Sequence, residues 1–257
     1  MHGSVGERST LDGDDFETYV AEPAGEPRGG LVLIHEIWGL VEHITDVADR
    51  LAGEGYLVLA PDILSRAGIT PQVGAELLRL RTSTDREEQA RLQPLMRERM
   101  APAQDPAYAS WAVAALRGTV DHLAASDGVG DRIGVLGFCF GGSYSFALAA
   151  ADPRIRVAIP FYGSPPDEAT VAEIRCPVLA FYGDRDERLI SGLPAVRERL
   201  AAAGVDFTAQ VYPGVGHAFF NDTNPHTYDA GAAADAWART LALLESELSS
   251  SGGAIAR

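Results

Sequence analysis

The sequence has little of several features that mark specialised classes of protein. Only two cysteines occur among 257 residues, which excludes a disulfide scaffold and predicts free thiols in a reducing compartment. No apolar run approaches the roughly 18 residues of a membrane helix. The polar start MHGSVGERST lacks the pattern of a secretory signal. These absences predict a cytoplasmic protein without a membrane segment.

Basic residues are also scarce. The chain has 21 Lys and Arg against 36 Asp and Glu, which gives a formal charge of −15. A polyanion such as a nucleic acid, or an anionic bilayer, would be repelled on average. Hydrophobic residues, by contrast, make up 46% of the chain, which is enough for a buried core. We therefore expect a globular protein that binds neither nucleic acid nor membrane.

Short β-branched and Leu-rich runs alternate with longer amphipathic stretches, as in βαβ units that build a mainly parallel sheet. Apolar runs such as LVLIH and YLVLAP suit strands that are buried on both faces. The predicted strands are Phe16–Ala21, as an antiparallel edge strand, and Gly30–His35, Gly55–Ala60, Arg132–Gly137, Val157–Tyr162, Val178–Tyr182 and Phe207–Tyr212. The predicted helices are about His43–Gly53, Ala107–Ala125, Ser143–Ala151, Pro194–Ala203 and Tyr228–Glu247.

The stretch from Leu64 to Pro106 differs from the rest because it is rich in arginine and clustered acids. This pattern predicts one or two solvated helices inserted between βαβ units. A second interpretation is that the insertion roofs a pocket, since insertions beyond the strand ends carry specificity in α/β folds. We expect one α/β domain over residues 1–257, with this charged helical insertion at about 64–106 and a flexible tail from about residue 248.

The most informative segment is GFCFGG at residues 137–142, between an apolar strand and a helix-like run. A nucleophile elbow needs small residues around the nucleophile, because the turn is strained and close to the sheet. The glycines beside Cys139 meet that need. A cysteine at the first turn of a helix also lies near unpaired N–H groups, which stabilise a thiolate. Cys139 is therefore the candidate nucleophile, and the N–H of Phe140 is a candidate oxyanion donor.

An acid and a base follow Cys139 in the order that this elbow architecture uses. The turn GDRD, with Asp184 and Asp186, comes after the strand CPVLAFYG, and spacing alone does not choose between the two carboxylates. The Gly-rich loop PGVGH places His217 after the last strand. The second cysteine, Cys176, has no comparable neighbours and is interpreted as structural.

The segment HEIWG follows the first long buried strand. In this architecture the loop there donates a second oxyanion N–H, which we assign to Ile37. Glu36 would be a carboxylate beside the thiol. A zinc site of the H-E-x-x-H type is excluded because Gly39 stands where its second histidine would be.

Together these motifs resemble the dienelactone hydrolase family, the carboxymethylenebutenolidases, within the α/β-hydrolase superfamily. The resemblance extends over Phe16–Leu244 and rests on HEIWG, YLVLAPDI, GFCFGG, YGDRDE and YPGVGHAFF. It implies an α/β-hydrolase fold in which Cys139 is the nucleophile, Asp186 the triad acid and His217 the base. Glu36 would be the carboxylate that the resting thiol contacts, and that accepts its proton when substrate binds.

One position departs from the family pattern. The family's lactonases carry an arginine four residues after the catalytic histidine, which grips the substrate carboxylate, whereas this chain has Asn221. An asparagine cannot form that charged bidentate pair, so arginines of the insertion such as Arg79, Arg81 or Arg86 are candidates for the charge. We predict substrate contacts for Trp38, Phe138, Phe219 and Asn221.

The expected reaction is hydrolysis of a lactone or activated ester through a thioester acyl-enzyme, with a small-molecule substrate and without metal or cofactor. Two alternatives stay open. One is a broad small-ester or thioester hydrolase without dienelactone activity, and the other is a non-catalytic binder that uses the same pocket. A dehydrogenase is disfavoured because no strand is followed by G-x-G-x-x-G. The sequence leaves the oligomeric state open.

Overall fold

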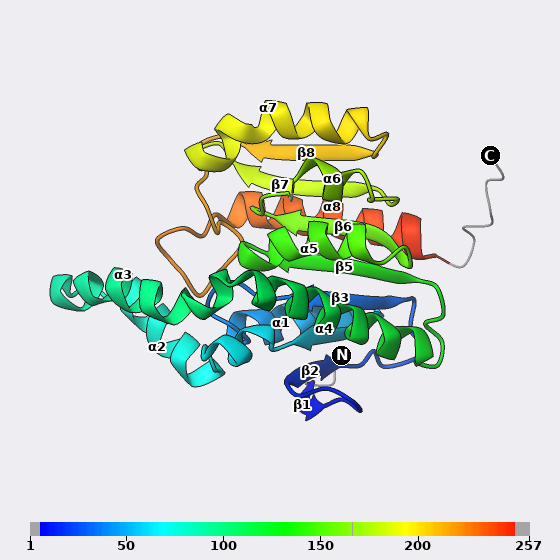
Figure 1. Ribbon diagram of the computed structural model, residues 1–257, viewed down its shortest axis with the longest axis horizontal. Helices are drawn as coiled ribbons and strands as arrows, with labels where there is room; N and C mark the ends of the chain where they lie inside the picture. The colour runs from blue at the N-terminus through cyan, green and yellow to red at the C-terminus, as the bar shows by residue number, and fades with distance from the viewer. Residues whose placement is uncertain (1–5, 166, 250–257) are drawn as a thin grey trace.

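A computed structural model describes residues 6–165 and 167–249, which are arranged around one eight-stranded sheet (Figure 1). The strand order is β1-β2-β4-β3-β5-β6-β7-β8. The first two strands run antiparallel to their neighbours, and the pairs from β4 to β8 are parallel. The strands are β1 Glu7–Thr10, β2 Glu17–Ala21, β3 Gly30–Ile34, β4 Leu57–Pro61, β5 Ile133–Phe138, β6 Ile155–Phe161, β7 Val178–Gly183 and β8 Phe207–Tyr212.

Helices cover both faces of this sheet. In Figure 1, α4 and α5 lie in front of the sheet, and α1 and α8 lie behind it. The α-helices are α1 Glu42–Gly53, α2 Pro71–Thr82, α3 Arg86–Met100, α4 Pro106–Ala125, α5 Phe140–Ala151, α6 Glu168–Val171, α7 Glu187–Ala202 and α8 Ala230–Leu248, with short 3₁₀ turns at Ile63–Ala67 and Pro102–Gln104. The helical cover explains why β3, β4 and β5 are buried along their whole length and read as continuous apolar runs.

The parallel strands end at one edge of the sheet, at the left of Figure 1. There the loop between β8 and α8, drawn in orange, lies on the same side as α2 and α3. In open parallel sheets, ligands bind beyond the carboxyl ends of the strands. We therefore expect a ligand site at the turns after β3, β5, β7 and β8.

The insertion between β4 and α4 consists of α2 and α3. Each begins at a polar capping residue: Thr70 accepts a hydrogen bond from the Val73 N–H, and Asp85 accepts one from the Glu87 N–H. An exposed ion pair between Arg79 and Glu88, at 2.8 Å, joins the two helices. In α3 only Leu92 is buried, so most of this helix faces solvent.

Several element boundaries differ from the sequence prediction. Strand β2 lies inside the sheet because β1, a short polar strand without an apolar pattern, covers its edge. Helix α5 starts at Phe140 rather than Ser143, since its first turn includes the elbow glycines. Helix α7 starts at Glu187 and passes through Pro194, where the prediction had placed its start. The short α6 was not predicted.

Two further expectations concern the chain end and membranes. The predicted flexible tail begins at the end of α8, and from residue 250 onward it lies outside the described residues. Within residues 6–165 and 167–249, no helix has the length and apolar character needed to cross a bilayer.

Candidate active site

Cys139 lies in a strained turn between β5 and α5. Its backbone has φ 55° and ψ −108°, in a region that a residue with a side chain rarely adopts. The turn is fixed from two sides, because the Cys139 N–H donates to the Phe161 carbonyl oxygen at 2.9 Å and its own carbonyl accepts from the Ser143 N–H at 3.1 Å. A conformation of this kind costs about 1–3 kcal/mol and persists only where the surroundings enforce it.

The glycines around the cysteine leave no room for side chains. A Cβ on Gly137 would collide with the Gly141 carbonyl group, one on Gly141 with the Ile34 carbonyl group, and one on Gly142 with the Phe161 carbonyl oxygen. Each collision involves backbone, which cannot move aside cheaply. The glycine spacing seen in the sequence therefore has a direct steric cause.

His217 and Asp186 complete a line of polar contacts with the cysteine. The His217 Nε2 lies 3.2 Å from the Cys139 Sγ, and its Nδ1 lies 2.5 Å from the Asp186 Oδ2. Asp186 follows β7 and His217 lies in the turn after β8, so neighbouring strands bring the two together. Asp184 lies elsewhere: its carboxylate accepts a hydrogen bond from the Gly214 N–H at 2.7 Å.

The electrostatics of this line favour a protonated imidazole. Burial acts to lower the pKa of His217, but its hydrogen bonds to Asp186 and Cys139 outweigh burial and raise that pKa to about 10. Burial likewise opposes the charge of Asp186, and the contact with His217 outweighs it and lowers the pKa of the carboxyl. A cationic imidazole beside the sulfur is the environment that stabilises a thiolate.

The loop after β3 lies directly against the elbow. The His35 carbonyl accepts a hydrogen bond from the Gly141 N–H at 3.1 Å, and the buried His35 ring stacks on Phe140, with 5.9 Å between ring centroids. This contact holds the loop that carries Ile37 against the first turn of α5, where Phe140 lies. Phe140 is the first residue of α5, where N–H groups have no partner within the helix.

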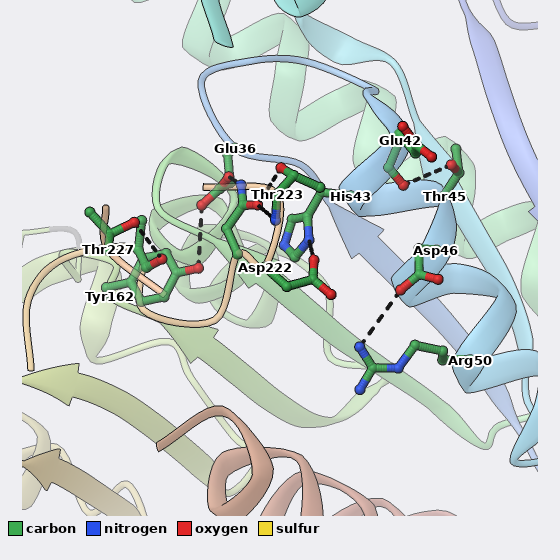
Figure 2. A network of polar contacts seen from close by, with 12 residues as sticks. Glu36, Glu42, His43, Thr45, Asp46, Arg50, Tyr162, Asp222, Thr223 and Thr227 are labelled. Carbon is green, nitrogen blue, oxygen red and sulfur yellow. Dashed lines mark hydrogen bonds and ion pairs between the residues drawn. The ribbon is translucent and has the colours of Figure 1, made fainter. Parts of the chain in front are cut away.

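Glu36 is buried in the same corner, with 1% of its surface exposed. Its Oε2 accepts a hydrogen bond from the Asn221 Nδ2 at 2.6 Å, and its Oε1 accepts one from the Tyr162 hydroxyl at 3.3 Å. Figure 2 shows Glu36 between Tyr162 and the turn that carries Asp222 and Thr223. Glu36 thus connects the loop after β3 with the end of β6 and with the loop between β8 and α8.

A cavity of about 420 Å³ opens above Cys139 and His217. Its walls combine the strand-end loops with the insertion helices, so the pocket joins distant parts of the chain. Arg81 contributes the one guanidinium group among the described lining residues, and no ion pair of Arg81 is found within the described chain. The lining residues are Glu36, Ile37, Trp38, Arg81, Leu92, Gln93, Met96, Cys139, His217, Ala218, Asn224 and Thr227.

The four predicted substrate contacts fall in two groups. Trp38 lines the cavity, whereas Phe138 and Phe219 are buried in an aromatic cluster and lie outside its lining. Asn221 is also buried and faces Glu36 instead of the cavity. Packing explains the position of these last three side chains, so of the four residues only Trp38 remains a candidate for substrate contact.

Sequence reasoning missed several residues that lie beside Glu36 or line the cavity. Tyr162, at the end of β6, has φ 39° and packs its ring against His217 with 5.0 Å between ring centroids. The run Phe161-Tyr162-Gly163 after an apolar strand was the available signal. No local pattern marked Asn224 or Thr227 as lining residues. Within the described parts of the chain, no group of three or more His, Cys, Asp and Glu side chains is arranged to hold a metal ion.

Comparison with known proteins decides the family. The model of the "Dienelactone hydrolase family" matches residues 16–248. The chain belongs to the dienelactone hydrolase family. Among curated dienelactone hydrolase relatives, a "putative carboxymethylenebutenolidase" of Escherichia coli K12 is 31% identical, over 89% of this chain and 82% of that protein. One of the same description from Saccharolobus solfataricus is 31% identical, over 91% and 95%.

Solved structures agree with this membership. A "putative dienelactone hydrolase" from Klebsiella pneumoniae has a TM-score of 0.77 and 27% identity, covering 93% of this chain and 98% of that one. An esterase from Thermogutta terrifontis shares the fold alone, with a TM-score of 0.61 and 18% identity over 97% and 95% of the two chains. The predicted fold class, an α/β-hydrolase fold around a mainly parallel sheet, is confirmed, as is the expected family.

Proposed function

We propose that this dienelactone hydrolase family member hydrolyses lactones or activated esters with Cys139 as nucleophile, Asp186 as acid and His217 as base. The observation that carries the proposal is the unbroken line from the Cys139 Sγ through the His217 ring to the Asp186 carboxylate, with contacts of 3.2 Å and 2.5 Å. A non-catalytic binder would have no need of this line beside a strained cysteine.

In the acylation step, the Cys139 sulfur attacks the carbonyl carbon, and the oxyanion accepts hydrogen bonds from the Ile37 and Phe140 N–H groups. Loss of one such donor costs about 100- to 1000-fold in rate. The bond to the leaving oxygen breaks as the carbonyl re-forms, and His217 delivers its proton to that oxygen. The product of this step is a thioester on Cys139 and a neutral imidazole.

In the deacylation step, the neutral His217 accepts a proton from water, and the resulting hydroxide attacks the thioester carbonyl. Asp186 holds the imidazole in the tautomer that presents Nε2 to the reacting atoms. The thiolate then leaves, and the acid product is released. Neither step requires a metal or an organic cofactor.

The leaving group limits the substrates that this chemistry favours. A thiolate is a good leaving group, so an ordinary alkoxide that stays nearby can reverse acylation. Ring opening of an enol-lactone expels a stabilised enolate, which attacks the thioester poorly and takes up the His217 proton. We therefore place enol-lactones and activated esters ahead of simple alkyl esters. Arg81 on the cavity wall is the cation available to a substrate carboxylate.

A broader esterase is the second candidate, and the position of Asn221 favours it. Asn221 stands where the family's lactonases carry an arginine, and its amide donates a hydrogen bond to Glu36. The arginine that would bind a substrate carboxylate in the family pattern is therefore missing here. A panel of p-nitrophenyl esters against cis- and trans-dienelactone separates the two candidates by kcat/KM. A higher value for neutral p-nitrophenyl esters than for both dienelactones would favour the broad esterase.

The test of the nucleophile compares the two cysteines. Cys139→Ala is expected to abolish turnover of p-nitrophenyl acetate while the melting temperature is kept. Cys176→Ala is the control: Cys176 is buried just before β7, and burial raises the pKa of its thiol to about 12, so activity should persist. Mass spectrometry of acid-quenched wild type should find an acetyl adduct on Cys139. Full activity in Cys139→Ala, or an inactive wild type, would contradict the proposal.

A further inference from the structure

The cavity has an apolar side that two distant segments of the chain build together. Ile37 and Trp38 belong to the loop after β3, and Leu92 and Met96 belong to α3. Leu92 and Met96 are four residues apart, so they lie on one face of that helix. We call these four side chains the apolar wall. Because they line the same cavity as Cys139, an ester bound at the cysteine lies within reach of apolar surface.

Met96 is the member of the apolar wall that the packing of the chain covers incompletely. Helix α3 is rich in charged side chains and buries only Leu92, whereas Met96 is half-buried where it lines the cavity. A thioether side chain in contact with water gains free energy when an apolar group covers it. The folded chain leaves part of that gain unused at Met96, so it is available to a ligand.

The apolar wall is held in place by α2 before any ligand binds. A Cβ on Gly74 would lie 1.7 Å from the Trp38 carbonyl oxygen, so this glycine lets α2 pack directly on the loop after β3. The Ser83 hydroxyl donates to the Glu88 carboxylate at 2.6 Å, and the Gln89 amide donates to the Ser83 carbonyl oxygen at 2.6 Å, which joins the end of α2 to the start of α3. Figure 1 shows both helices at the edge where the parallel strands end. A surface that is ordered in advance costs a ligand little conformational entropy.

The proposed chemistry assigns the two parts of an ester to different parts of the cavity. His217 delivers a proton to the leaving oxygen, so the leaving group lies beside the loop between β8 and α8, which also supplies Asn224 and Thr227 to the lining. These two side chains are polar, in keeping with a leaving group that becomes an alcohol or an enol. The acyl group stays on Cys139, and most of the lining left for it is the apolar wall.

We infer, building on the proposed hydrolase function, that the apolar wall is an acyl subsite and that Met96 is a specificity-determining residue within it. Among activated esters, the preferred substrates then carry a medium-length apolar acyl chain, such as a butanoyl or hexanoyl group. The cavity of about 420 Å³ has the size of a small-molecule pocket and room for such a chain. The polar insertion residues of the lining, Arg81 and Gln93, are exposed, so their polar ends can stay in water while the chain lies on the wall.

A series of p-nitrophenyl esters tests the subsite, because it changes the acyl group and keeps the leaving group. For the wild type, kcat/KM is divided by the rate of alkaline hydrolysis of the same ester, which removes differences in intrinsic reactivity. This normalised kcat/KM should rise on the order of 100-fold from acetate through butanoate to hexanoate, since each methylene that leaves water contributes about 4-fold.

Met96→Gln and its matched control Met100→Gln test the wall itself. Both methionines are half-buried in α3, but Met100 lies outside the cavity lining. Glutamine is close to methionine in size, so the substitution changes the polarity of the wall and keeps its shape. Met96→Gln should lower the hexanoate-to-acetate ratio of kcat/KM about 10-fold, and Met100→Gln should keep that ratio within about 2-fold of wild type. A ratio taken within one variant does not depend on the amount of folded protein.

The outcomes separate this inference from the proposed function. In an active wild type, a normalised kcat/KM that stays level or falls from acetate to hexanoate would overturn the acyl subsite, and so would equal ratios in the two variants. A wild type without Cys139-dependent turnover would instead contradict the proposed function. The wall is then tested by binding of 2-heptanone, which carries the alkyl chain of hexanoate and is not hydrolysed. It should bind more tightly than acetone and more weakly to Met96→Gln than to Met100→Gln, and equal affinities of the two variants would overturn the inference.

Discussion

Two regions meet at the cavity, and they are built in different ways. The strand-end frame, which consists of residues 35–39, Cys139, Asp186 and His217, is fixed by backbone contacts and buried side chains. The insertion, α2 and α3, is charged and exposed, and α3 buries only Leu92. In the proposed function the frame positions the reacting atoms, whereas the insertion supplies cavity-lining side chains such as Arg81, Leu92 and Met96. The comparison predicts that substitutions in the insertion alter substrate preference without altering the reaction.

The largest expected effect comes from breaking the frame at Asp186. Asp186→Asn removes the carboxylate that outweighs burial, so the pKa of His217 should fall from about 10. Without that partner the imidazole also loses its preferred tautomer, and kcat should fall on the order of 10⁴-fold. Asp184→Asn, two residues away, is the control and should keep kcat within a few-fold. NMR titration of His217 together with ester turnover checks both, and equal losses in the two variants would contradict the assignment.

The next largest effect is expected from adding a side chain at a glycine of the elbow, which should lower the free energy of unfolding. In Gly141→Ala the added methyl group meets the Ile34 and His35 carbonyl groups, so the free energy of unfolding should fall by about 3 kcal/mol. Gly192→Ala is the matched control. Gly192 lies in α7 with open space around its Cα, and alanine there should stabilise the helix by about 0.5–1 kcal/mol. Urea unfolding measures the difference, and a Gly141→Ala variant as stable as wild type would refute the steric argument.

A smaller effect is expected at Asp62, a buried acid next to His35 of the strand-end frame. Burial raises the pKa of Asp62 to about 6 against the weaker effect of Arg8, and its Oδ1 lies 4.0 Å from the His35 Nε2. Between pH 4 and 6 the unfolded chain releases this proton while the folded chain keeps it, so wild-type stability should decline by about 2 kcal/mol over that range. Asp62→Asn lacks this group, and its amide can donate to His35. Its stability relative to wild type should therefore rise between pH 4 and 6, and parallel stability profiles would contradict this.

The smallest effect tests the insertion. Arg81→Gln should raise KM for a carboxylate-bearing lactone about 10-fold, the effect of losing one charged hydrogen bond at an accessible site, and leave kcat for p-nitrophenyl acetate unchanged. Arg86→Gln is the control, because Arg86 begins α3 and lies outside the cavity lining. Steady-state kinetics with both substrates provides the measurement. An equal rise in KM for the two variants would show that Arg81 does not contact the carboxylate.

Local sequence determined most of the fold and the order in which the candidate nucleophile, acid and base follow one another along the chain. The buried strands are continuous apolar runs, and the glycines around Cys139 are required by carbonyl oxygens that lie 2.1 to 2.4 Å from where a Cβ would be. Both features depend on backbone sterics and solvation over a few residues, which a sequence displays directly. The polar strand β1 was missed because it has no local apolar signal. The start of α7 was misplaced because Pro194, which lies inside the helix, is typical of a first helical position.

Only the tertiary structure decided which side chains meet. It brought Asp186 rather than Asp184 to His217, put Arg81 rather than Arg86 on the cavity wall, and joined Asn221 to Glu36 across 185 positions of sequence. Such contacts depend on how loops from neighbouring strands pack, and a shift of one residue exchanges one partner for another. Local backbone geometry selects the residue types that can react, and the sequence displays them, whereas their pairing is a property of the packed whole.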